Sequence, residues 1–96
     1  MSPDKFNKLL KLRKKLDILD NSLINLIKKR TGIIDQVLLL KVYKNQIVDK
    51  KRIKFILDQI RKKSIKKKID PKITNRIWTH MIRAYIDYEK RNFKKK

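Results

Sequence analysis

The sequence predicts an all-α protein with three helices per chain, of which the first is long. The 96 residues include one glycine and two prolines, so the chain lacks the turn residues that β-hairpins require. Apolar residues recur at helical spacing from Phe6 to Phe93. Asp49 and Asp70 each precede a segment whose apolar residues recur at helical spacing, where N-cap residues are expected.

The first helix is predicted from about Lys5 to about Tyr43. Its apolar residues recur in alternating steps of three and four and form a seam that consists of Leu9, Leu12, Leu16, Leu19, Leu23, Leu26, Ile33, Val37 and Leu40. At ~1.5 Å per residue the helix measures roughly 58 Å, whereas a compact chain of this length has a radius of gyration of about 12–13 Å. One chain cannot cover such a rod, so we expect an intertwined homodimer in which a second copy covers the seam.

The second and third helices are predicted from their caps. Asp49 is the expected N-cap of a helix that ends near Lys63, with one apolar face formed by Ile53, Ile56, Leu57 and Ile60. Asp70 and Pro71 are the expected N-cap and N1 residues of a helix that reaches about Phe93. Its inner faces are expected to hold Ile73, Ile77, Trp78, Met81, Ile82 and Tyr85. We therefore predict one domain over residues 1–96, with a core at about 6–93 and a frayed basic tail at 94–96.

The composition limits the function classes. The chain has 29 Lys and Arg residues against 9 Asp and Glu residues, which gives a formal net charge of +20. This charge is either a bias of low-GC coding, since Lys occurs 22 times and Ala once, or an electrostatic surface that attracts anions. The absence of cysteine excludes disulfides, thiolate metal sites and a cysteine nucleophile, and the single histidine, His80, cannot build a histidine-rich metal cluster. No apolar run approaches the roughly 20 residues of a membrane span, so we expect a cytoplasmic protein with no membrane partner.

A few charged residues fall on otherwise apolar helix faces. Arg30 occupies a seam position between Leu26 and Ile33, and Lys41 follows eleven residues later, about 20° around and ~16 Å along the same helix. Both side chains can reach one small ligand, or each can extend its aliphatic stem over apolar surface without any chemical role. Glu89, the only glutamate of the sequence, lies in an apolar and aromatic row, either as a site residue or as a surface acid paired with a neighbouring cation.

These residues carry a resemblance to a known family. The segment LRKKLDILDNSLINLIKKR, residues 12–30, resembles the first helix of the all-helical chorismate mutase family, which includes isochorismate pyruvate lyase-like members. Its Arg13, Asp20 and Arg30 match the family's spacing of an Arg, an Asp seven residues on and an Arg ten further. The resemblance spans residues 6–93, and the further matching residues are Lys41, Asp49, Arg52 and Glu89.

The resemblance implies an isomerase of aromatic amino acid biosynthesis, in the shikimate pathway, that converts chorismate to prephenate. This pericyclic reaction needs no nucleophile, metal or cofactor. The resemblance also implies active sites shared across the homodimer. Arg13 lies seventeen residues, roughly 25 Å, from Arg30 on the same helix, so Arg13 would reach the site only from the partner chain.

The resemblance assigns roles to the matching residues. Arginines such as Arg30 would hold the two carboxylates of the substrate, with Asp49 and Arg52 contributing from the second helix. Lys41 would donate a hydrogen bond to the ether oxygen as its bond breaks. Glu89 would have to be protonated to donate to the same oxygen, so we expect turnover to fall as the pH rises.

Two residues depart from the mutase pattern. Ile53 stands where mutases usually carry a Glu that binds the ring hydroxyl of the substrate, and Tyr85 stands where many members place a Ser near a carboxylate. Both residues are similar to those of isochorismate pyruvate lyases, which form salicylate and pyruvate on the same fold, so the lyase is an alternative. A non-enzymatic basic dimer that binds nucleic acid through residues 61–68 and the lysine tail is another.

Overall fold

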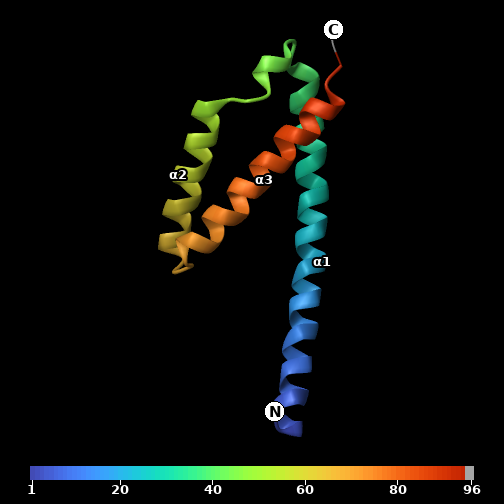
Figure 1. Ribbon diagram of the computed structural model, residues 1–96, viewed down its shortest axis with the longest axis vertical. Helices are drawn as coiled ribbons and strands as arrows, with labels where there is room; N and C mark the ends of the chain where they lie inside the picture. The colour runs from blue at the N-terminus through green and yellow to red at the C-terminus, as the bar shows by residue number, and fades with distance from the viewer. Residues whose placement is uncertain (95–96) are drawn as a thin grey trace. The chain divides into compact units, whose positions relative to one another are not determined.

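The computed structural model describes residues 1–94 and contains three α-helices, as predicted. They are α1 (Pro3–Leu40), α2 (Lys50–Lys66) and α3 (Pro71–Asn92), and a short 3₁₀ turn, η1 (Lys44–Gln46), follows α1 (Figure 1). The described part of the chain has no strand, so the all-α fold class is confirmed. The chain divides into two compact units, one up to Ile33 and one from Ile34 onward.

The first unit is the N-terminal part of α1. The Ser2 side chain accepts a hydrogen bond from the backbone N–H of Lys5 at 3.3 Å. The negative charge of Asp4 in the first turn interacts favourably with the positive end of the helix dipole. The seam leucines are more than half exposed in the single chain: Leu12, Leu16, Leu19, Leu23 and Leu26. The first unit therefore leaves an apolar stripe uncovered by its own chain.

The end of α1 differs from the sequence prediction. We expected the helix to continue to about Tyr43, and this is wrong, because it ends at Leu40. The backbone N–H of Lys41 bonds to the carbonyl of Leu38, three residues earlier, at 3.1 Å. The next two amides bond to the side chain of Gln46 instead of to helix carbonyls. Lys41 therefore lies beyond the helix, and the helical geometry that related it to Arg30 does not apply.

Both predicted N-caps are confirmed. Asp49 Oδ1 accepts a hydrogen bond from the backbone N–H of Arg52 at 3.0 Å, and Asp70 Oδ1 accepts one from Lys72 at 2.9 Å. Pro71 occupies the first turn of α3, where its missing N–H costs nothing. The chain reverses direction at the tight turn between the two helices, which diverge from that turn like the arms of a V (Figure 1).

Helix α2 ends three residues later than predicted, in a Schellman motif. The N–H of Ile69 bonds to the carbonyl of Ser64 at 2.9 Å, and that of Lys68 bonds to Ile65 at 3.1 Å. Lys68 takes the left-handed position with φ of 58°, which is usually filled by glycine. The sequence has no glycine here, so the usual signal of a helix end is missing. The predicted end near Lys63 is therefore three residues too early.

The second unit buries a small core where its elements meet. Leu38, Ile47 and Ile82 are its buried apolar residues, and the apolar face predicted for α2 is half-buried. Helices α2 and α3 are also joined by the hydroxyls of Ser64 and Thr74, 2.7 Å apart. Ser64 is 3% exposed and its hydroxyl also donates to the carbonyl of Ile60 at 2.6 Å.

One predicted face of α3 is partly wrong. Ile73 and Ile77 are exposed, although we expected them on the inner faces. The covered row instead runs through Thr74, Trp78 and Ile82, four residues apart, and the two isoleucines lie one residue, about 100°, away from it. The predicted basic tail covers 94–96, of which 95 and 96 lie outside the described residues. None of the described helices is long and apolar enough to span a membrane.

Candidate active site

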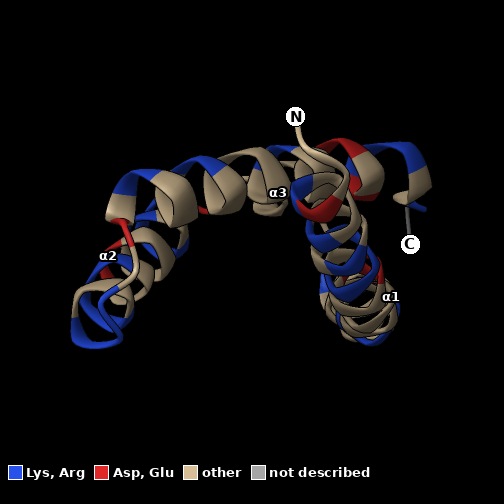
Figure 2. Ribbon diagram, turned by 90° about the horizontal axis from the view of Figure 1, so that it is seen from below, with Lys and Arg blue, Asp and Glu red and all other residues tan. Residues whose placement is uncertain are grey.

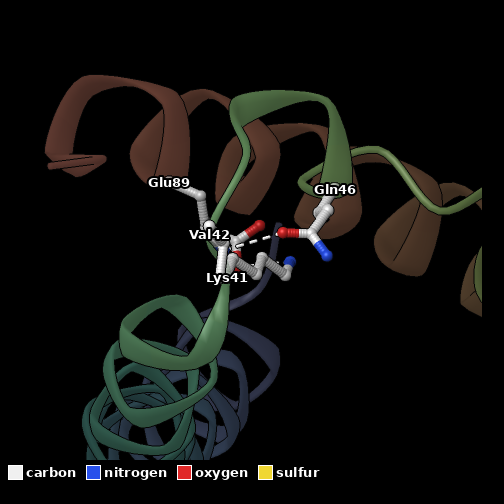
Figure 3. A network of polar contacts seen from close by, with 4 residues as sticks. All are labelled: Lys41, Val42, Gln46 and Glu89. Atoms are coloured by element: carbon white, nitrogen blue, oxygen red, sulfur yellow. Dashed lines mark hydrogen bonds and ion pairs between the residues drawn. The ribbon is translucent and has the colours of Figure 1, made fainter. Parts of the chain in front are cut away.

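A partly buried ion pair joins the segment that follows α1 to α3. The Nζ of Lys41 donates to Oε1 of Glu89 at 3.1 Å, and the two side chains are 19% and 6% exposed (Figure 3). Ions removed from water lose hydration energy, and the close contact between opposite charges offsets part of that loss. A ligand that reached this pair would meet a fixed ammonium and a fixed carboxyl group away from bulk solvent.

Glu89 is buried because it continues the covered face of α3. It lies four residues after Tyr85 and seven after Ile82, so the three side chains share one side of the helix. The alternative, a surface acid paired with its sequence neighbours, is wrong. Arg91 instead pairs with Asp87, at 2.9 Å on the exposed side.

Lys41 is held on a short non-helical segment by a residue that the sequence analysis missed. Gln46 Oε1 accepts a hydrogen bond from the backbone N–H of Val42 at 2.7 Å (Figure 3). It also accepts one from the backbone N–H of Tyr43 at 2.8 Å. A Gln three residues after the residue that precedes a helical turn is the spacing of a capping box, which could have indicated this contact.

A second contact ties the same part of α1 to α3. The hydroxyl of Tyr88 donates to Asp35 Oδ1 at 2.7 Å, and the Tyr88 ring meets the Tyr85 ring edge to face, with centroids 6.4 Å apart. The hydrogen bond to the Asp35 carboxylate raises the pKa of Tyr88 above its ordinary value, because it favours the protonated phenol. No periodic pattern in the sequence indicated this pair.

The predicted residues at the start of α2 have local roles in the structure. The Asp49 carboxylate caps the helix through the backbone of Arg52, so the Asp-x-x-Arg spacing is that of an N-cap and its third helical residue. The Arg52 guanidinium lies over the Phe55 ring, 5.3 Å from its centroid. Ile53 is half-buried and offers no polar group to a ligand.

Arg13 and Arg30 lie in the first unit, on one uninterrupted helix. Their seventeen-residue separation along α1 therefore holds, and it corresponds to roughly 25 Å. Arg13 is exposed, whereas Arg30 is half-buried with a buried Nη1 atom. The Arg30 guanidinium is thus not in open solvent.

Positive charge is spread over the whole chain. Figure 2 shows ribbon segments of Lys and Arg on all three helices and much less of the ribbon coloured for Asp and Glu. In the described residues no group of three or more His, Cys, Asp or Glu side chains is placed to hold a metal ion. The chemistry offered by the site is that of ammonium, guanidinium and carboxyl groups, which suits the binding of a small anion.

The fold and the site together define an all-helical protein whose long helix carries spaced arginines and whose Lys41 pairs with a buried glutamate. The chain belongs to the chorismate mutase type II family, since the model of that family matches residues 12–90. No curated protein and no solved structure gives a significant match. Membership supports chorismate mutase-type activity in general, an isomerase reaction on a small-molecule substrate.

Proposed function

We propose that the chain is a chorismate mutase that rearranges chorismate to prephenate, in the cytoplasm and for aromatic amino acid biosynthesis. The observation that carries the proposal is the largely buried contact between Lys41 and Glu89 inside the segment that matches the family. The reaction breaks and forms bonds within one molecule, so the protein has to supply only a conformation and an electrostatic environment.

Cations on helices suit that task. The substrate carries two carboxylates, and a guanidinium such as that of Arg30 binds a carboxylate through two parallel hydrogen bonds while it remains ionised. These contacts would hold the side chain of the substrate over its ring, in a conformer that is rare in solution.

Lys41 would stabilise the transition state. Negative charge grows on the ether oxygen as its bond breaks, so an ammonium donor there binds the transition state more tightly than the substrate. Glu89 holds the Lys41 ammonium at 3.1 Å and would also reach the ether oxygen. An ionised carboxylate accepts and cannot donate, so a direct hydrogen bond from Glu89 requires its protonated form.

The proposal includes an intertwined homodimer. The exposed seam leucines of the first unit match a second copy of the same seam, because burying them removes a long apolar stripe from water. Arg13 of the partner would then complete the site that contains Arg30, since one helix cannot bring both to one ligand. The single domain over 1–96 would be completed by this pairing.

A second candidate is isochorismate pyruvate lyase activity, which yields salicylate and pyruvate. Ile53 supplies no hydrogen-bond partner for the ring hydroxyl of chorismate, and Tyr85 is a half-buried aromatic residue packed on Tyr88. The same cations would serve this reaction, because it is also pericyclic and its substrate is also a dicarboxylate. Asp49 and Arg52 remain substrate-binding candidates under both reactions.

One assay separates the two reactions. Purified protein is incubated separately with chorismate and isochorismate, and prephenate, pyruvate and salicylate are identified by chromatography and mass spectrometry. We expect prephenate from chorismate, lost in Arg30→Ala. If isochorismate yields salicylate while chorismate yields no prephenate, the lyase is the function and the mutase proposal is wrong. If neither substrate gives a product, both proposals are contradicted.

A further inference from the structure

We propose that Gln46 is a positioning residue for Lys41, and that its side-chain carbonyl keeps the Lys41 ammonium on Glu89. Gln46 matches none of the residues to which the family resemblance gives a role. The kinetic part of the inference rests on the proposed function, whereas its structural part can be measured without any substrate.

The argument starts from the end of α1. The helix ends at Leu40, and the N–H of Lys41 still bonds to the Leu38 carbonyl at 3.1 Å. The two amides after Lys41 bond to the Gln46 side chain and not to the helix. A helix fixes the direction of its side chains through its backbone angles. Lys41 lacks this support on its C-terminal side, so other contacts must fix its direction.

Gln46 supplies those contacts. Its Oε1 accepts hydrogen bonds from both amides that directly follow Lys41. The bond from Val42 measures 2.7 Å (Figure 3), and the bond from Tyr43 measures 2.8 Å. One acceptor that holds two consecutive amides restricts the backbone angles between them. The peptide plane that leaves Lys41 is therefore tied to the Gln46 side chain.

Gln46 is itself anchored to the fold. Its backbone N–H bonds to the carbonyl of Tyr43 at 3.0 Å, and that of Ile47 bonds to Lys44 at 3.2 Å. Ile47 is 4% exposed and belongs to the core of the second unit. The turn thus connects the core to the segment that carries Lys41, and the Gln46 side chain makes the contacts to that segment.

Removing this link should loosen Lys41 without unfolding the protein. Val42 and Tyr43 are exposed, so water can replace the lost acceptor at their amides. The small core formed by Leu38, Ile47 and Ile82 does not contain the Gln46 side chain. The expected result is a larger fraction of molecules in which the Lys41 ammonium has left Glu89.

Two substitutions separate the carbonyl from the bulk of the side chain. Gln46→Met keeps the length and removes the acceptor, whereas Gln46→Glu keeps an acceptor for both amides. Asn45→Ala in the same turn is the matched control, because Asn45 is exposed and makes no hydrogen bond described for the turn. The measurement is the rate at which an amine-acylating reagent modifies Lys41, followed by peptide mass spectrometry with exposed Lys90 as internal reference.

We expect Gln46→Met to raise the acylation rate of Lys41 roughly five- to tenfold, the effect of losing an ordinary hydrogen bond, and Gln46→Glu and Asn45→Ala to stay within about twofold of the parent. If Gln46→Met fails to fold by circular dichroism, Gln46→Asn, whose shorter side chain cannot reach both amides, takes its place. A Lys41 rate that stays at the parent value in the folded variant would overturn the inference.

Turnover gives a second and separate readout. We expect Gln46→Met to lower kcat with little change in KM, because Lys41 is needed mainly at the transition state, and Gln46→Glu to restore part of kcat. A fall in stability alone would not produce this split in folded protein. If the parent itself shows no turnover, the proposed function fails while the acylation rates still decide the role of Gln46.

Discussion

The phenol of Tyr88 on α3 donates a hydrogen bond to the carboxylate of Asp35 on α1, with 2.7 Å between the oxygens. Tyr88 lies one residue before Glu89 on α3, and Asp35 lies on α1 six residues before Lys41. It is therefore a second tie between the two segments that carry the candidate catalytic pair.

This hydrogen bond predicts a measurable alkaline titration. It raises the pKa of Tyr88 above 10.0, so it favours the protonated phenol in the folded protein. Its contribution to stability is present below the unfolded pKa, near 10, and is lost as the pH rises through the higher folded pKa. We expect Tyr88 to ionise above the ordinary pKa of tyrosine when tyrosinate absorbance is followed against pH, with its titration assigned by its loss in Tyr88→Phe. Asp35→Asn should lower the pKa of Tyr88, and an unchanged titration in that variant would exclude the hydrogen bond in solution.

The strained end of α2 predicts a stabilising substitution. Lys68 has φ of 58°, a conformation that costs L-residues roughly 1–2 kcal/mol and costs glycine nothing. Lys68→Gly should therefore raise the free energy of unfolding by about 1 kcal/mol in urea titrations followed by circular dichroism. Lys67→Gly removes the same charge at φ of −89° and should be neutral or destabilising. Equal effects of the two substitutions would show that charge, not backbone strain, matters here.

Helix existence and helix starts were predictable from the sequence because their signals are local. The cap residues Asp49 and Asp70 act on amides two or three residues away, and the apolar seam of α1 repeats over many turns. Helix ends were less predictable. The end of α1 depends on the Gln46 side chain from a later turn, and the end of α2 places a lysine where the usual signal is glycine.

The candidate site was predictable only where a polar residue interrupts an apolar pattern. Glu89 carries such a signal, because a lone acid in a covered row has to find a partner, and the structure pairs it with Lys41. Tyr88 carries no such signal, since it acts through one contact that depends on the tertiary fold. Gln46 carries only the local spacing of a capping box, which does not involve the apolar pattern. Whether Arg13 and Arg30 serve one site stays a prediction.

Mixing two inactive chains tests the shared site. Arg13→Ala and Arg30→Ala should each abolish turnover as homodimers, because each removes one cation from every site. A heterodimer of the two would contain one site with both substitutions and one site with neither. We therefore expect activity to return after the chains are unfolded together and refolded, up to about half of the turnover per heterodimer. Heterodimer formation is checked by native mass spectrometry, and its presence without activity would exclude a site built from two chains.

The role of Glu89 predicts a change in the pH profile. A carboxyl group donates a hydrogen bond only when it is protonated, so turnover should fall as the pH rises if Glu89 donates to the ether oxygen. Glu89→Gln supplies an amide donor at every pH and should flatten the profile, measured as kcat/KM across the stable pH range. Asp87→Asn, on the exposed side of α3, removes the same charge and should leave the profile as it is. A Glu89→Gln profile that still falls would place the titrating group elsewhere.

Finally, substitutions in the exposed basic segment between α2 and α3 distinguish an enzyme from a protein that binds polyanions. Lys66, Lys67 and Lys68 are exposed and lie at the tight turn of the hairpin, away from the Lys41 contact in sequence and in the fold. Reversing the three charges to Glu should leave turnover within about twofold, because the proposed mechanism uses fixed cations in contact with the substrate and not the distant field. Any salt-dependent binding to a single-stranded oligonucleotide, measured by fluorescence anisotropy, should weaken sharply in the same variant. Arg30→Ala should show the opposite pattern, with turnover lost and oligonucleotide binding kept. The catalytic proposal would be contradicted if the folded variant with the three lysines changed to Glu lost turnover while Arg30→Ala retained it. Turnover would then depend on the surface charge of this segment and not on Arg30.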